Sequence, residues 1–474
     1  MRRALAAITA GLCLLAIAPP PANAHALGAT FQLPVPLWLY LVAAAVAVAA
    51  SFVVAAVVVR PAAEVPSYPV RRLSSELARG VSALLAAIGV VWWLRVVVVA
   101  FLVGGLTPEP AVQFWILLWV GVPIVAVLLG NPWPSLSPFR TLFGALEWAA
   151  RRAGIERLDA GFRYPAALAR WPAVVFLLAG IWSELVLPSR TDATRVGVIL
   201  LAYTLITLAG MILFGRVAWL RNAELFEILL GWFGRIGPIG RRAADRALCD
   251  GCMERCDPDR CVDCPECAAA AEPGERRAEL RPWFAGLIEP VRAGWSDAAF
   301  IVLALAGVTF DGLLETSAWG VVLDVIFPPL QSLAGAELAS VLAGTIGLVG
   351  LWLLFLAAFA LATHITRRLA TPGYRFGRML GTYAVTLLPI AGGYFIAHYL
   401  TEVIQGVQWL PELIGDPLAA VEPSVDWIPI QLVWYLSVGA IVLGHVVAIA
   451  LAHRLALRTR PGRPLLAGLP LVLL

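Results

Sequence analysis

Apolar stretches recur along this chain, and each is about as long as the roughly 20 residues that a helix needs to cross a bilayer. Hydrophobic residues make up 60% of the chain and charged residues 14%, whereas about a quarter of the residues of a soluble protein are charged. This composition excludes an ordinary cytosolic enzyme, a disordered chain and a nucleic-acid-binding protein. We therefore predict an all-α, polytopic helical membrane bundle whose main partner is the lipid bilayer.

The N-terminus has the pattern of a signal peptide in residues 1–24. Arg2 and Arg3 precede an apolar run, and residues 22–24 form the small-x-small site at which such peptides are cut. Cleavage would leave His25 as the first residue of the mature chain, on the outer side of the membrane. The alternative is an uncleaved first helix, which would be short and interrupted by the prolines of residues 19–21.

After the signal peptide, the sequence predicts about nine transmembrane helices. Their approximate limits are 35–59, 81–103, 111–130, 171–188, 196–215, 297–319, 341–363, 379–400 and 430–452. Five fall in residues 25–215, which include a cytoplasmic amphipathic segment at 131–170, and four fall in residues 297–463. The cytoplasmic segment 216–296 separates the two groups, and the amphipathic pattern of residues 223–233 predicts a helix on the inner membrane surface. Residues 464–474 form a short C-terminal tail.

The distribution of arginine orients the predicted bundle. The chain has 35 basic residues, all of them arginine, and 30 lie in segments predicted to be cytoplasmic. The predicted outer segments hold two, Arg190 and Arg195. This asymmetry follows the positive-inside rule and places the N-terminus outside and the C-terminus inside. The net charge of +4 therefore reflects membrane topology rather than an acidic partner.

Six cysteines gather within 19 residues of the predicted cytoplasmic segment. They are Cys249, Cys252, Cys256, Cys261, Cys264 and Cys267. The cytoplasm disfavours disulfides, and the C-x2-C pairs 249/252 and 264/267 have the spacing of tetrahedral zinc sites. We predict a structural zinc in a Cys-rich module at 249–267, with Cys256 and Cys261 as spare thiols or as ligands of a second metal. An iron–sulfur cluster, for which the cysteine order differs from that of bacterial ferredoxins, and the absence of a stable metal are the alternatives.

Several ionisable residues fall in the outer parts of predicted spans, where polar groups are costly and often functional. From the helical rise, Arg95 and Asp311 lie roughly 12–14 Å below the outer ends of their spans. Glu184 and Glu315 lie about 6 Å deep and His398 about 3 Å deep. Because Asp311 and Glu315 are four residues apart, their carboxylates share one face of a helix.

This outer group has two interpretations. As a functional site, His398 and the carboxylates of Asp311 and Glu315 would hold a second metal ion together with the N-terminal His25, and that metal would activate water or bind a substrate. The ligand types do not fix which metal it is. As a structural feature, Arg95 and Asp311 would form a buried ion pair, and the remaining groups would face an aqueous vestibule.

Two further features concern the last spans. His445 lies near the inner side of its span, roughly 20 Å from His398 along the membrane normal, which weighs against a haem shared by the two residues. We expect His445 to bond within the bundle instead. Pro389 interrupts the eighth predicted span, as prolines do in kinked membrane helices.

Short strings spread over most of the chain carry a resemblance to a known family. They are residues 25–28 (HALG), 33–39 (LPVPLWL), 137–142 (SPFRTL), 397–400 (AHYL), 443–445 (LGH) and 451–453 (LAH). The chain resembles a family of bacterial multi-pass membrane proteins, some of which are labelled fenitrothion hydrolase or a component of it. The resemblance implies a bacterial inner-membrane protein that hydrolyses an organophosphorus ester, with or without a second subunit. It assigns no catalytic residues.

Three functions of different classes fit these observations. The first is a metal-dependent hydrolase or hydrolase subunit working at the outer face, with Asp311, Glu315, Glu184 and Arg95 as catalytic groups beside His398. The second is a small-solute or metal-ion transporter or channel, in which the same acidic residues form a relay. The third is an assembly or sensor protein whose zinc module recruits a cytosolic partner.

Overall fold

The structure, a computed structural model, describes residues 68–188, 190–243, 263–264, 276–288, 293–370, 373–413, 415 and 422–459. The predicted signal peptide, the predicted span 35–59 and the tail 464–474 lie outside these residues. Helices dominate the described part, and eight helical stretches within it are long and apolar enough to cross a membrane. The chain is therefore a multi-pass integral membrane protein with a helical fold.

Seven of these long stretches coincide with predicted spans. They are α3 (Ser75–Val103), Glu109–Leu128, α9 (Ala193–Phe214), α15 (Trp295–Leu314), α17 (Ala336–Ala370), Phe376–Val407 and α20 (Ile430–Thr459). The stretch Glu109–Leu128 consists of α4 (Glu109–Ala111), the π-helix η2 (Val112–Gly121) and α5 (Val122–Leu128). The stretch Phe376–Val407 consists of α18 (Phe376–Ala384), the 3₁₀ turn η5 (Val385–Leu387) and α19 (Leu388–Val407). Pro389 stands in the first turn of α19, so the predicted interruption is confirmed.

The predicted span 171–188 is α8 (Trp171–Leu185), which has only 15 residues. Its first residues adjoin the start of α15, because the backbone N–H of Arg170 donates to Ser296 Oγ. Farther along, Ile181 packs against Gly307. The two helices therefore run side by side in the same direction, and α8 brings Glu184 to the level of Asp311.

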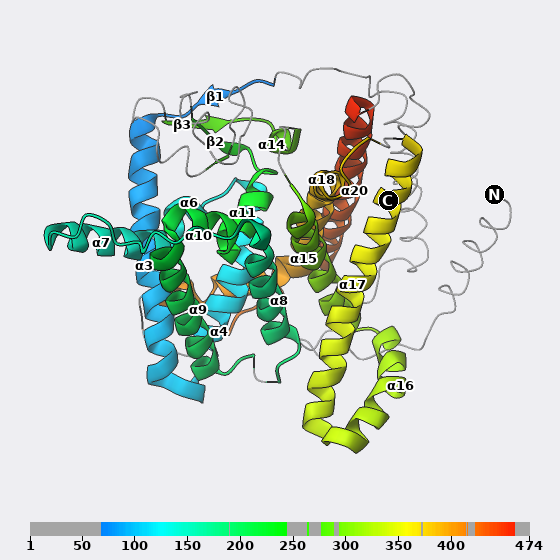
Figure 1. The fold of residues 1–474 in the computed structure, drawn as a ribbon. Helices are drawn as coiled ribbons and strands as arrows, with labels where there is room; N and C mark the ends of the chain where they lie inside the picture. The colour runs from blue at the N-terminus through cyan, green and yellow to red at the C-terminus, as the bar shows by residue number, and fades with distance from the viewer. Residues whose placement is uncertain are drawn as a thin grey trace.

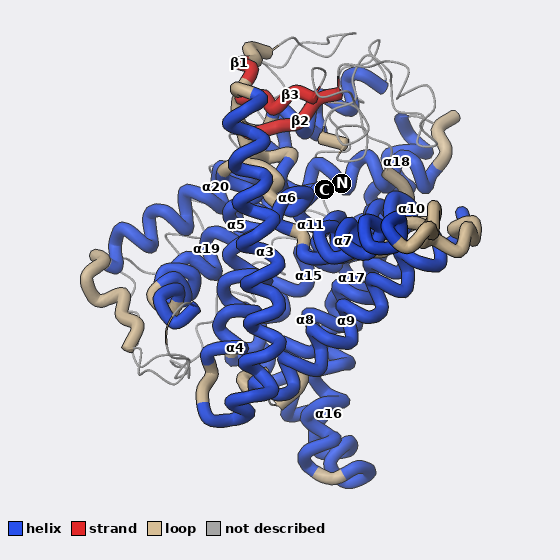
Figure 2. Tube along the Cα trace, turned by 90° about the vertical axis from the view of Figure 1, so that its left-hand side faces the viewer, coloured by secondary structure: helices blue, strands red, loops and turns tan. Residues whose placement is uncertain are grey.

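The eighth long apolar helix, α16 (Ser317–Ala334), was not predicted as a span. Trp295 at the start of α15 and His364 near the end of α17 both pack against Phe376, so α15 and α17 are antiparallel. The segment between them therefore begins and ends on the same side of the bilayer, and α16 does not cross it. Figures 1 and 2 show α16 beside the first turns of α17, at the end of the molecule opposite the sheet.

A small antiparallel sheet covers the end of the bundle at which α3 begins, which the arginine distribution predicts to be cytoplasmic (Figure 1). Its strands, in the order β1-β3-β2, are β1 (Arg71–Arg72), β3 (Arg276–Leu280) and β2 (Ile239–Ala243). The sheet was not predicted, since its arginines were interpreted only as topology signals. The remaining short elements are η1 (Gly104–Leu106), α6 (Trp133–Leu136), η3 (Ala166–Leu168), α10 (Arg216–Asn222), α14 (Ala285–Ile288) and η6 (Leu410–Leu413).

The amphipathic segment 131–170 contains α7 (Pro138–Arg152), which projects sideways from the bundle in Figure 1. Phe139 and Phe143 on one face of α7 are buried, whereas Leu146 and Trp148 are exposed. A helix with this distribution beside the ends of membrane spans is typical of the bilayer interface. The structure therefore agrees with the predicted amphipathic character of this segment.

The helix α11 (Leu225–Gly234) corrects the prediction for residues 223–233. Nearly all of its side chains are buried in the bundle, so it does not lie on the membrane surface. Glu224 caps it from inside, because its carboxylate accepts hydrogen bonds from the backbone N–H groups of Phe226 (3.1 Å) and Glu227 (2.7 Å). This ten-residue helix has one charged side chain, Glu227, and the surrounding protein buries it on nearly every side. Membrane proteins tolerate short helices that do not span the bilayer where other parts of the protein surround them.

Candidate functional site

A polar group in the half of the bundle that is predicted to be outer joins α15 to α19. Oδ2 of Asp311 lies 3.0 Å from Nε2 of His398 and accepts a 2.8 Å hydrogen bond from the hydroxyl of Tyr399. The side chains of His398 and Asp311 are 23% and 19% exposed, so the pair is partly open. The structure thus brings together two of the residues that the sequence singled out, and adds Tyr399.

Three more carboxylates surround this pair. Glu315 and Glu402 lie close enough to His398 to interact with its charge, and Glu184 interacts in the same way with Asp311. One carboxylate oxygen of Glu402 is buried and has no hydrogen-bond partner among the described residues. A buried anionic oxygen without a partner is costly, so this surplus of negative charge favours a bound proton or cation.

Aromatic side chains hold the site in place. Trp119 donates a 2.7 Å hydrogen bond to Glu184, and the ring of Tyr394 stacks on His398 at 5.9 Å between ring centroids. Trp119 belongs to η2, whose π-helical winding covers ten residues. Segments of π-helix are rare and often occur at functional sites. Trp115 on the same segment donates to the backbone carbonyl of Arg190, which attaches the loop between α8 and α9 to η2.

Arg95 does not take the partner that the structural interpretation gave it. Its guanidinium forms an ion pair with Glu109, whose side chain is fully buried, whereas the described partners of Asp311 are His398 and Tyr399. The prediction of an Arg95–Asp311 pair is therefore wrong. Equal depth in the membrane does not place two residues on facing sides of their helices, which is why the depth argument failed here.

A small cavity lies directly inward of the Asp311 group. It measures about 20 Å³ and is lined by Glu184, Tyr399, Trp119 and the α11 residue Leu229, among others. One water molecule needs ~10–15 Å³ of such space, so the cavity can hold water between two polar side chains. The polar group thus continues from Asp311 toward the buried helix α11.

The described residues do not by themselves complete a metal site. Nowhere in the described ranges do three His, Cys, Asp or Glu side chains converge as metal ligands would. His25, the fourth predicted ligand of the outer metal, lies outside the described residues. The outer metal ion therefore stays a prediction, and the geometry of Asp311 and His398 must be interpreted without it.

The cysteine module also lies largely outside the described residues. Cys249, Cys252, Cys256, Cys261 and Cys267 are not described, so the predicted zinc is not tested. Cys264 is described, and its sulfur accepts a 3.4 Å hydrogen bond from the guanidinium of Arg221. Beside it, Asp263 forms a 2.7 Å ion pair with the buried Arg281. These contacts attach this point of the module to α10 and to the residue that follows β3.

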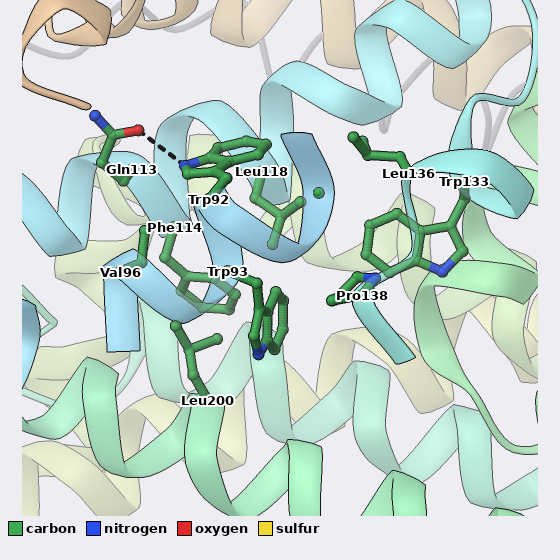
Figure 3. A pocket seen from close by; sticks show the side chains of 11 residues that line it. Trp92, Trp93, Val96, Gln113, Phe114, Leu118, Trp133, Leu136, Pro138 and Leu200 are labelled. Carbon is green, nitrogen blue, oxygen red and sulfur yellow. Dashed lines mark hydrogen bonds between the residues drawn. The ribbon is translucent and has the colours of Figure 1, made fainter. Parts of the chain in front are cut away.

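A second cavity, between α3, η2, α6 and α9, is not a binding site. Figure 3 shows aromatic rings around it, including Trp92, Trp93 and Phe114, and the bond from Trp92 to Gln113. It measures about 10 Å³, at the lower limit for one water molecule. Gly89 lies on its wall, and a Cβ atom at this position would collide with the carbonyl oxygen of Leu136. We interpret this cavity as a packing gap in the core.

His445 bonds within the bundle as predicted, since its Nδ1 donates to the carbonyl oxygen of Ile441 at 2.8 Å.

The residues that sequence reasoning missed are Tyr399, Trp119 and Glu402. Tyr399 and Glu402 follow His398 by one and four residues, and the spacing of four alone could have pointed to Glu402 on the same helix face. Trp119 gave no such signal, because tryptophan is common throughout this chain.

Comparison with known proteins identifies no relative: no protein-family model matches the chain, and no curated protein or solved structure is significantly similar to it.

Proposed function

We propose that the protein is a membrane-embedded hydrolase, or the membrane subunit of one, with its reaction centre at the Asp311–His398 pair. The contact of Asp311 Oδ2 with both His398 and Tyr399 supports this proposal most strongly. A carboxylate that orients a histidine is a recurrent arrangement for general-base catalysis. Such a pair in the outer half of a bilayer is costly, which favours a functional role over a structural one.

The geometry suggests how the pair would act. Asp311 favours the tautomer of His398 that carries its proton on Nε2, which leaves a lone pair on Nδ1. That nitrogen makes no hydrogen bond within the described residues. It can accept the proton of a water molecule as the water oxygen attacks an electrophilic centre, and it can return the proton to the leaving group. The carboxylates of Glu315 and Glu402 would stabilise the imidazolium formed in between.

The surroundings of the pair favour an uncharged ester as substrate. The site holds four carboxyl groups against one nearby arginine, Arg190, so it offers no excess of positive charge to attract an anionic substrate. An apolar neutral ester would also partition into the outer leaflet beside the site. A neutral organophosphorus triester, the class implied by the family resemblance, meets both conditions.

The test is hydrolysis of a chromogenic neutral phosphotriester by the purified protein in liposomes. We expect His398→Ala to lose activity by about 100-fold or more, the usual contribution of a positioned base. His445→Ala is the matched control, because that histidine bonds only to its own helix in the described structure. Full activity of His398→Ala would overturn the proposal, as would equal losses in both variants.

A second candidate is a proton-coupled or cation transporter. The 20 Å³ cavity beside Glu184 favours it, since the cavity extends the acidic group inward. A transporter should show pH-gradient-dependent flux in sealed proteoliposomes that Glu184→Gln abolishes. The hydrolase hypothesis instead predicts that the wild type shows no such flux.

The Cys-rich module remains a proposed structural zinc site and a docking point for a cytosolic partner. Metal analysis of the purified protein tests it beside a variant in which Cys249, Cys252, Cys264 and Cys267 are changed to serine. We expect about one zinc in the wild type and none in the variant. Zinc that survives in the variant and disappears with His398→Ala would instead locate the metal at the outer cluster.

A further inference from the structure

A large hollow opens at the cytoplasmic end of the bundle, far from the Asp311 group. It measures about 550 Å³ and lies between the loop before α8 and the starts of α8, α15 and α18. Its walls include Trp171, Trp295, Ser296, Asp297 and Arg378. Volumes of roughly 300–1,000 Å³ are typical of sites that bind small molecules or headgroups.

The charge of the hollow is positive. Asp297 is its only acidic wall residue, and an ion pair with Arg170 offsets its charge. Arg378 is exposed and forms no ion pair or side-chain hydrogen bond within the described residues. The hollow therefore presents one unopposed guanidinium, a group that binds phosphate well because its N–H donors match the phosphate oxygens.

The position of the hollow matches the inner headgroup layer. It lies where three membrane helices begin, on the side where Arg367 and Arg368 end α17. Trp171 and Trp295 at its walls are 39% and 44% exposed. Exposed tryptophans at the ends of spans are characteristic of the membrane interface, and arginines on this side follow the positive-inside rule.

We propose that this hollow binds the headgroup of an anionic phospholipid of the inner leaflet. The phosphate would contact Arg378, and Trp171 and Trp295 would pack against the glycerol and upper acyl chains. Basic pockets between membrane helices on the cytoplasmic side bind anionic lipids for the same reason. The proposal is independent of the hydrolase, because no residue of the hollow contacts Asp311 or His398 in the described structure.

The experiment measures the melting temperature of the full-length protein in neutral detergent with added phosphatidylglycerol or phosphatidylcholine. Phosphatidylglycerol should raise Tm by about 3 °C more than phosphatidylcholine does. Arg378→Ala should lose this difference, and Arg378→Lys, which keeps the charge, should retain most of it. Arg79→Ala is the matched control, since it removes one exposed arginine from the cytoplasmic end of α3, away from the hollow.

An equal response of the wild type to both lipids would overturn the proposal, as would an Arg378→Ala variant that responds like the wild type. Inorganic phosphate is the third arm: if it alone gives the Arg378-dependent shift, the occupant is a soluble anion and the lipid assignment is wrong. Native mass spectrometry of the wild type gives a readout that needs no variant. Phosphatidylglycerol should remain bound in excess over phosphatidylcholine at equal supply, and equal retention would contradict the proposal.

Discussion

Two acidic groups in this bundle use the same kinds of side chain but differ in burial and in hydrogen bonding. The inner group centres on Glu224, whose carboxylate accepts bonds from Tyr203 (2.6 Å), from Trp133 (2.8 Å) and from two backbone N–H groups of α11. The outer group centres on Asp311, whose Oδ2 atom contacts both His398 and Tyr399. The first is sealed and saturated with hydrogen bonds, whereas the second is partly exposed.

The difference supports a structural role for Glu224 and is consistent with the reactive role that we propose for the Asp311 group. Every bond of Glu224 fixes a neighbouring element, and its side chain is wholly buried, so no capacity remains for a substrate. In the outer group, one oxygen of Glu402 is buried without a described partner, and Nδ1 of His398 is free of described bonds. Unused hydrogen-bonding capacity at a partly open site favours chemistry over architecture.

The largest effect should come from removing the inner carboxylate. Glu224→Ala leaves an indole N–H, a phenol and two backbone N–H groups without their acceptor inside the bundle. We expect a loss of about 3–5 kcal/mol in the free energy of unfolding. Unfolding in SDS titrations would measure it. A loss below that of surface variants would show that the inner group is not the structural one.

The second prediction concerns Arg95, whose ion pair with the buried Glu109 indicates a structural role. Arg95→Leu leaves the buried carboxylate of Glu109 without its cation, and we expect about 3 kcal/mol of destabilisation. Because Arg95 pairs with Glu109 and not with Asp311, hydrolytic activity per folded molecule should stay near wild type. Esterase assays of the folded fraction, corrected by size-exclusion chromatography, check this. A loss of activity in the folded fraction would show instead that Arg95 contributes to the outer site.

The third prediction is a loss of activity without a loss of folding, at the outer group. Asp311→Asn keeps the shape of the side chain and removes the charge that orients His398, so hydrolysis should fall by about 100-fold while the protein still folds. Thermal unfolding and activity measured on one preparation separate the two effects. If the variant unfolds but its folded fraction remains active, Asp311 belongs with Glu224 as a structural carboxylate.

The smallest effect should come from a pair outside both groups. Glu147 on α7 and Arg216 on α10 form an ion pair at 3.0 Å, and their side chains are 28% and 37% exposed. Solvent screens such pairs, so Glu147→Ala should change the free energy of unfolding by less than about 1 kcal/mol. The same SDS titration calibrates the two larger losses. A loss equal to that of Glu224→Ala would mean that burial does not separate the groups as argued.

Sequence reasoning predicted the spans well because long apolar runs leave few alternatives in a bilayer. It failed where length or pattern was ambiguous. The ten residues of α11 are amphipathic enough to suggest a surface helix, and only the internal contacts of Glu224 explain why they are buried. The small sheet was missed because it pairs strands such as β1 and β3, which are about 200 residues apart in the sequence.

The sequence predicted the depth of the site residues in the membrane, but not which side of its helix each residue occupies. Counting residues along the helices placed Asp311, Glu184 and His398 in one outer layer, and the structure brings the first and last into contact. The same count paired Arg95 with Asp311, which is wrong because rotation about each helix axis decides which residues face each other. The side chain of Arg95 faces Glu109, the first residue of α4, and pairs with it.

The most direct test of the central claim is a double-mutant cycle on Asp311 and His398, with phosphotriester hydrolysis as the readout. Residues that act as one catalytic unit lose their effect together, so Asp311→Asn combined with His398→Ala should be no slower than the slower single variant. All three variants should fold, which thermal unfolding in the same liposomes would establish. Losses that multiply in the double variant, or a double variant with near wild-type activity, would contradict the account of the outer pair as one reaction centre.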